Sequence, residues 1–283
     1  MQVCCVDPQP TFILPPSDID KMKAQLALID KFMNDIEKGE ATSITFDDIT
    51  NAVTVIDGII LSLDNSNDFF KIGGFKRLVP LLNCPNAEVV ATTAELIADL
   101  CQNNTFCQTK ALELGILSEL VKQLANPIDP KVRLKSLYAL SCLCRHNEES
   151  IKCLSESNAV QVLLQILHEP DEKLRTKTAF FITHLSEHEN FREAFYSTDL
   201  VPTLIKLLSS EQDSSSEYLL SALENQVSRH LQSRVQSSSD EYNLLEILRT
   251  KVKLYNSEEE FQESTEYCKK LLALCFPDAK LDS

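Results

Sequence analysis

The sequence predicts an all-α fold, built as a solenoid of about four central repeats with helical caps at both ends. Three observations support this prediction. Only five glycines and eleven prolines occur among 283 residues, so the turn chemistry typical of sheets is scarce. Apolar residues recur at steps of three and four, which is the spacing of one helix face. The middle of the chain also repeats itself about every 42 residues.

The N-terminal part is predicted to form an arm followed by capping helices. Residues 1–16 are interrupted by prolines and lack helical periodicity, so we expect a flexible arm. Residues 17–72 should form two capping helices, one beginning near Ser17 and one at Thr45, which has Asp48 at capping-box spacing. Their apolar stripes are predicted to comprise Ile19, Met22, Leu26, Ile29, Met33 and Ile36 in the first helix and Phe46, Ile49, Val53, Ile56, Ile60 and Leu63 in the second.

Residues 73–235 are expected to hold the repeats. Four segments align, and their starts step by 41, 43 and 41 residues, at Gly74, Gly115, Asn158 and Asp199. Late apolar positions keep nearly the same step, at Leu100, Leu143, Leu185 and Val227.

Each unit is predicted to contain a short helix, a polar link and a longer helix. Pro130 after Asp129 and Pro170 before Asp171 suit the start of the longer helix, where a missing N–H costs nothing and a carboxylate favours the dipole. This layout matches the armadillo and HEAT period, in which stacking buries a face that no unit can bury alone. We therefore predict an armadillo-like, right-handed superhelix.

The C-terminal part, residues 236–283, is predicted to close the solenoid with capping helices and a tail. It begins with the polar break QSSSD at residues 236–240. Ser257 and Glu260 have capping-box spacing at the start of the last helix. Polar residues in these helices would cover the exposed stripe of the final repeat.

Composition excludes several classes of function. A net charge of −15 argues against a nucleic-acid partner, because phosphate binding needs concentrated Lys and Arg. No apolar stretch approaches the roughly 20 residues that span a bilayer, and no secretory signal precedes the first helix, so we expect a cytoplasmic protein without a membrane partner. The ten cysteines lie mostly in apolar periodic segments and are expected to act as small core residues.

No pattern predicts catalysis, a cofactor or a metal site. The pair Gly73-Gly74 lacks the GK[ST] sequence of a phosphate-binding loop and is expected to form a helix-ending turn. On a helix, Cys144 would face away from Cys142 and His146, so the three side chains could not converge on one metal ion. His184 and His188 are expected to share a helical face, but no third ligand accompanies them. We therefore expect a binding protein, not an enzyme.

The concave face of the solenoid is the candidate functional surface, since the longest helix of each repeat generally lines it. Aligning the four long helices matches Asp99 with Cys142, His184 and Gln226. Tyrosine and arginine are common hot-spot residues. A basic and aromatic band before the matched position is therefore our binding hypothesis, and it comprises Arg133, Lys135, Tyr138, Arg175, Lys177 and Phe180.

Three segments resemble the heat shock protein 70-binding protein 1 family of armadillo-type nucleotide exchange factors. They are VRLKSLYALSCLCR at residues 132–145, KLRTKTAFF at 173–181 and EEFQESTEYCKKLLALCF at 259–276. The resemblance extends roughly from Asp18 to Phe276.

The resemblance implies a curved clamp that embraces lobe II of the nucleotide-binding domain of a 70-kDa heat-shock chaperone and releases ADP. It implies partner contacts for Glu95, Asp99, Arg133, Lys135, Tyr138, Lys177, Phe180 and His184. The alternative is a generic armadillo scaffold that binds an extended peptide. Such scaffolds carry ladders of Trp and Asn, whereas this chain has no Trp.

Overall fold

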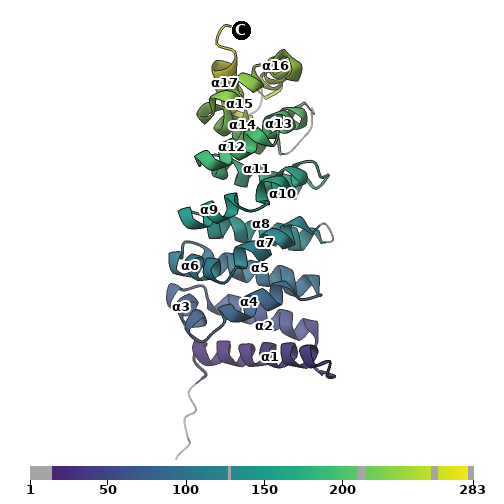
Figure 1. Ribbon diagram of the computed structural model, residues 1–283, viewed down its shortest axis with the longest axis vertical. Helices are drawn as coiled ribbons and strands as arrows, with labels where there is room; N and C mark the ends of the chain where they lie inside the picture. Colours follow the sequence, from purple (N-terminus) through teal and green to yellow (C-terminus); the bar gives the residue numbers. More distant parts are fainter. Residues whose placement is uncertain (1–14, 127–128, 210–214, 256–260, 280–283) are drawn as a thin grey trace, which may run out of the picture.

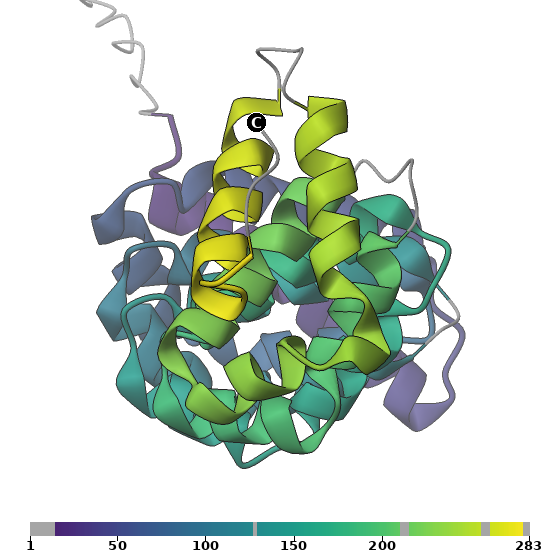
Figure 2. The same cartoon turned by 90° about the horizontal axis from the view of Figure 1, so that it is seen from above.

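The computed structural model describes residues 15–126, 129–209, 215–255 and 261–279. All regular structure within these ranges is helical, with seventeen α-helices and one 3-10 helix. The helices stack into a column, with the first helix at one end and the last at the other (Figure 1). Seen from above, successive groups of helices fan out around the long axis instead of superposing (Figure 2).

The helices fall into groups that follow one another along the column. The first group is α1 (Asp18–Lys38), α2 (Phe46–Ile59) and α3 (Leu63–Lys71). Four groups of three follow: α4 (Phe75–Leu82), α5 (Ala87–Cys101) and α6 (Thr105–Glu113); α7 (Ile116–Ala125), α8 (Pro130–Cys144) and α9 (Glu148–Ser155); α10 (Ala159–Leu167), α11 (Glu172–Leu185) and α12 (Glu189–Ser197); α13 (Leu200–Leu208), α14 (Ser216–Arg229) and α15 (Leu231–Ser237). The last group is η1 (Asp240–Tyr242), α16 (Leu244–Tyr255) and α17 (Gln262–Cys275).

Six helices of 14 or 15 residues, one in each group, pack one on the next through the column. We call α2, α5, α8, α11, α14 and α17 the ladder helices and their exposed side the ladder face. The helix that precedes each ladder helix packs against it, as α4 does against α5 and α7 against α8. The core lies between these two rows and runs continuously through the stack.

Helix starts follow the side-chain chemistry that the sequence predicts. Ser17 and Thr45 both form capping boxes, with Asp20 and Asp48 as the reciprocating carboxylates. Asp129 accepts hydrogen bonds from two backbone N–H groups of the first turn of α8, which begins at Pro130. The predicted starts of these helices are confirmed.

Each repeat contains a third helix that the apolar periodicity did not predict. The helices α6, α9, α12 and α15 have only seven to nine residues, and they fill the link between one ladder helix and the next repeat. Asn104 and Asn147 cap α6 and α9 by accepting hydrogen bonds from the backbone N–H of Cys107 and Ser150. These two asparagines, 43 residues apart, were the available signal.

A buried amide joins consecutive repeats through these short helices. Gln108 of α6 donates hydrogen bonds from Nε2 to the carbonyls of Cys142 and Arg145, each at 3.0 Å. Arg145 is the C-cap residue of α8, at the helix end where backbone carbonyls have no partner within the helix. The third helix therefore satisfies the carboxyl end of the next ladder helix.

Two predicted core positions are wrong. Ile36 is 45% exposed, although it continues the apolar spacing of α1. Leu63 is 61% exposed and belongs to α3, because α2 ends at Ile59 and the chain turns before Leu63. Most of the predicted arm and the predicted capping box at Ser257 and Glu260 lie outside the described residues.

Candidate partner-binding face

The ladder helices α5, α8 and α11 carry all eight side chains that the sequence analysis assigned to a partner. Glu95 and Asp99 lie on α5, and the remaining six divide between α8 and α11. Their burial differs widely, from the exposed Phe180 to the buried Arg133. The eight side chains therefore differ in how accessible they are to a partner.

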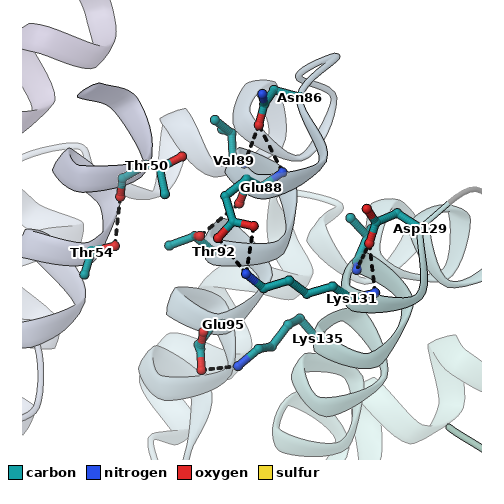
Figure 3. Close-up of polar contacts among 11 residues, drawn as sticks. Thr50, Thr54, Asn86, Glu88, Val89, Thr92, Glu95, Asp129, Lys131 and Lys135 are labelled. Atoms are coloured by element: carbon teal, nitrogen blue, oxygen red, sulfur yellow. Dashed lines mark hydrogen bonds and ion pairs between the residues drawn. The ribbon is translucent and has the colours of Figure 1, made fainter. Parts of the chain in front are cut away.

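Two ion pairs connect α5 with α8 (Figure 3). Lys131 donates from Nζ to both carboxylate oxygens of Glu88, at 2.6 and 2.7 Å, and Lys135 donates to Glu95 Oε1. Lys135 and Glu95 side chains are 25% and 39% exposed. The Lys135 charge is thus matched within the protein, and both groups stay accessible from the ladder face.

Arg133 does not belong to the accessible surface. Its side chain is 7% exposed, its Nε donates to the carbonyl of Leu124 at 2.9 Å, and its two terminal nitrogens bind both carboxylate oxygens of Glu169. Glu169 lies in the link between α10 and α11, so the pair joins consecutive repeats. Arg133 lies on the predicted helix, but its guanidinium binds Glu169 within the protein, and the sequence alone could not show this pairing.

A group of carboxylates meets between α2 and α5. The Asp57 carboxyl, from α2, shares a hydrogen bond with that of Asp99, and Glu95 lies close enough to act on both. Burial raises the pKa of Asp57 to about 6, and the charges of Asp99 and Glu95 add to the effect. Burial and the Glu95 charge also raise the pKa of Asp99. A hydrogen bond between two carboxyls requires a proton on one of them.

Replacing Asp57 by Asn is expected to raise the free energy of unfolding near neutral pH by about 1 kcal/mol, and to leave it nearly unchanged at about pH 4. The folded-state pKa lies above the unfolded value of about 3.9, so the stabilising contribution of Asp57 is complete below that value and is lost as the pH rises through about 6. Asparagine keeps a donor for Asp99 without the repulsion. Urea unfolding at several pH values measures the difference.

Asp64 supplies the control for this prediction. Its side chain is exposed in the first turn of α3, and Asp64→Asn should change stability by no more than a few tenths of a kcal/mol at any of these pH values. A gain from Asp57→Asn that is equal at acidic and neutral pH would contradict the shared proton.

Two aromatic side chains are exposed on the ladder face. Tyr138 on α8 is 39% exposed and Phe180 on α11 is 48% exposed. The Phe180 ring meets the Tyr218 ring of α14 edge-on, with ring centroids 6.3 Å apart. Burial raises the pKa of Tyr138 to about 12, and a hydrogen bond with the Cys142 side chain adds to the effect, so the hydroxyl remains protonated at neutral pH. Lys177 is also exposed, one turn before Phe180.

His184 and His188 do not share one helix. His184 lies in the last turn of α11, whereas His188 is the residue that precedes α12, and their rings meet edge-on at 6.1 Å. Each ring has its own carboxylate, Glu187 for His184 and Glu148 for His188, both at 3.5 Å. Burial lowers the pKa of His184, which favours the neutral ring at physiological pH.

The matched positions of the four long helices are only partly exposed. Cys142 and Gln226 are buried, and Gln226 donates from Nε2 to the carbonyl of Arg192 and to the Ser233 hydroxyl. Cys144 is also buried, as expected for a core cysteine. Within residues 15–126, 129–209, 215–255 and 261–279, no three His, Cys, Asp or Glu side chains gather closely enough to hold a metal ion.

Three further residues belong to the ladder face, and the repeat pattern did not predict them. Asp57 precedes the repeats, so aligning the repeats could not reach it. Tyr218 lies about two turns before its matched position, Gln226, whereas Tyr138 and Phe180 lie about one turn before theirs. Arg145 follows the last residue of α8 and so lies beyond the aligned helix positions. Only the packing of α2, α11 and α14 places them beside the predicted residues.

Comparison with known proteins gives both a family and a fold. Residues 65–200 match the family model described as the SIL1/FES1/HPBP1 C-terminal domain, and these residues contain all eight predicted contacts. Hsp70-binding protein 1 of Macaca fascicularis is 28% identical over 94% of this chain and 74% of its own length. The Hsp70 nucleotide exchange factor FES1 of Mycosarcoma maydis is 31% identical over 51% of this chain and 37% of its own length.

Solved structures similar to this chain confirm the armadillo-like solenoid. A designed armadillo repeat protein in complex with the peptide (KR)4 has a TM-score of 0.72 and 19% identity, and the match covers 90% of this chain and 99% of that protein. A computationally designed armadillo repeat protein for modular peptide recognition gives a TM-score of 0.71 at 17% identity, over 89% and 99% of the two chains. In the part of the chain described here, no helix has both the length and the apolar character needed to cross a bilayer.

Proposed function

The chain belongs to the SIL1/FES1/HPBP1 family, and from this membership we propose that it is a nucleotide exchange factor for 70-kDa heat-shock chaperones. The observation that carries the proposal is the family match over residues 65–200, which contain the ladder helices α5, α8 and α11 and with them all eight predicted contacts. Relatives of this chain are named Hsp70-binding protein 1 and Hsp70 nucleotide exchange factor FES1, and these names support both the proposed partner and the proposed activity.

Nucleotide exchange requires differential binding and no chemical step in this protein. The solenoid must bind the chaperone conformation that has released ADP more tightly than the one that holds it. A preference of about 1 to 3 kcal/mol corresponds to roughly 5- to 150-fold coupling between the two ligands. Because the coupling is reciprocal, ADP must weaken the binding of this protein to the chaperone by the same factor.

We propose that the ladder face of this protein contacts the chaperone. On the chaperone, we assign the contact to lobe II of the nucleotide-binding domain. The accessible candidates are Glu95, Asp99, Lys135, Tyr138, Lys177, Phe180 and His184, while Arg133 is left out because it is buried. A continuous stack of helices suits this role, since it presents contact residues from successive ladder helices on one face.

We propose the cytosol as the working compartment. Eight cysteines within the described residues are free thiols, and six of them are buried. Burial raises the pKa of Cys107 and Cys268 to about 12, so these thiols remain protonated and unreactive. Free buried thiols without disulfides are typical of reducing compartments.

Stopped-flow release of a fluorescent ADP analogue from a cytosolic 70-kDa chaperone tests the proposed function. Mixing the loaded chaperone with excess unlabelled nucleotide and increasing concentrations of this protein should accelerate release until the rate saturates. Binding measured by calorimetry should be at least about fivefold weaker with saturating ADP than without nucleotide.

An inert solenoid is the appropriate comparison, and a designed armadillo repeat protein of the same length provides one. It should leave the release rate unchanged at every concentration. If this protein also leaves the rate unchanged at concentrations that saturate binding, it is not an exchange factor for that chaperone.

A further inference from the structure

A groove opens on the ladder face between α8 and α11. These two helices pack less extensively than any other pair of successive ladder helices. The space between them encloses a cavity of about 320 Å³, which is large enough for an aromatic or aliphatic side chain. Its walls are mainly apolar and aromatic, with Leu134, Leu137 and Tyr138 from α8 and Phe180 and Phe181 from α11.

Three basic side chains lie at the rim of this groove. Lys135, Arg145 and Lys177 line it together with the Ser141 hydroxyl. Lys135 is paired with Glu95, whereas the exposed Arg145 and Lys177 have no carboxylate within 4.0 Å among the residues the structure describes. Unmatched cations beside an apolar groove are unexpected in a chain with 42 acidic and 27 basic side chains.

Two exposed aromatic rings beside a groove require an explanation of their own. Tyr138 and Phe180 are each more than a third exposed, and both line the groove instead of packing into the core. Leaving large apolar surface in water is unfavourable, and aromatic residues around a concave site are typical of interface hot spots. The pattern indicates a site that is completed by another molecule.

We propose that the groove between α8 and α11 holds an apolar side chain of the chaperone, and that acidic residues flanking this side chain pair with Arg145 and Lys177. This inference rests on the proposed function and specifies the chemistry of its interface. Burial of the apolar side chain would supply affinity, and the two cations would select a partner surface of opposite charge. Lys135 is already neutralised by Glu95 and would contribute mainly its aliphatic stem.

Binding of the intact protein to the nucleotide-free chaperone, measured by calorimetry, tests the groove. Phe180→Ala should weaken binding at least tenfold, and Ser141→Leu, which fills the groove and leaves every other group in place, should do the same. Lys177→Glu should lower the association rate about tenfold at low salt, and the loss should shrink as salt increases.

Matched variants separate the groove from general damage. Phe106→Ala truncates a ring on α6 that is 41% exposed, and Lys173→Glu reverses an exposed charge on α11 outside the groove. Both should bind within twofold of the unmodified protein. Circular dichroism must show that Phe180→Ala and Ser141→Leu melt cooperatively with unchanged helix content.

Outcomes for the groove and for the function are distinguishable. If the unmodified protein accelerates ADP release and Phe180→Ala and Ser141→Leu bind within twofold of it, the groove proposal is wrong while the function stands. If the unmodified protein neither binds nor accelerates release, both proposals fail. Self-association that disappears in Phe180→Ala would place a second copy of the chain in the groove and would also overturn the proposal.

Discussion

Gly74→Ala is expected to lower the free energy of unfolding by about 2 to 4 kcal/mol, although the backbone at this position, with φ of −57°, accepts any residue. An added Cβ would lie no more than 2.5 Å from three carbons of the Phe69 ring. Phe69 is 1% exposed and packs against Phe75 with ring centroids 5.9 Å apart. The ring therefore has no space to move into, and α3 and α4 must separate.

Gly58 is a matched control on α2. Its added Cβ would meet no atom within 4 Å, and the residue is helical, so Gly58→Ala should stabilise the protein by up to about 1 kcal/mol. Chemical unfolding followed by circular dichroism measures both variants. Equal effects of the two substitutions would show that the contact with Phe69 is not what requires glycine at position 74.

Glu169→Gln is expected to destabilise the protein by about 2 to 4 kcal/mol, because it leaves the buried charge of Arg133 without its carboxylate. The Arg133 side chain is only 7% exposed, so water cannot replace the lost partner. Replacing both residues, as Arg133→Met with Glu169→Gln, should restore most of the loss. About 1 kcal/mol should remain, since the Leu124 carbonyl also loses the hydrogen bond that Arg133 donates.

The pair of Glu88 and Lys131 provides the comparison. It also joins consecutive repeats, but its side chains are 50% and 52% exposed. Glu88→Gln should therefore cost less than about 1 kcal/mol, and salt should reduce even that. The explanation for Glu169 would be contradicted if its substitution cost no more than that of Glu88, or if the double substitution were as destabilising as Glu169→Gln alone.

Periodic apolar residues predicted the ladder helices and their order well. The reason is physical, since a helix of 14 or 15 residues that packs on both neighbours must carry apolar side chains at regular steps. The third helix of each repeat was missed because seven to nine residues hold too few steps to establish a period. Their capping residues, such as Asn104, are the stronger signal.

The candidate site was predicted less completely than the fold. Repeat alignment placed Tyr138, Lys177 and Phe180 on one face, and the structure leaves all three exposed. The same alignment could not distinguish Lys177 from Arg133, because both are basic residues near the start of a ladder helix. What separates them is Glu169, which lies 36 residues from Arg133 along the chain, and such pairings are decided only by packing.

The uneven stacking of the ladder helices has a mechanical consequence. The first and last helices lie at opposite ends of the column, so a load applied at one end passes through every joint before it reaches the other (Figure 1). Compliances in series add, and the softest joint therefore contributes most of the bending. The sparse packing of α8 against α11 makes that joint the natural flexure point of the molecule, close to the middle of its length.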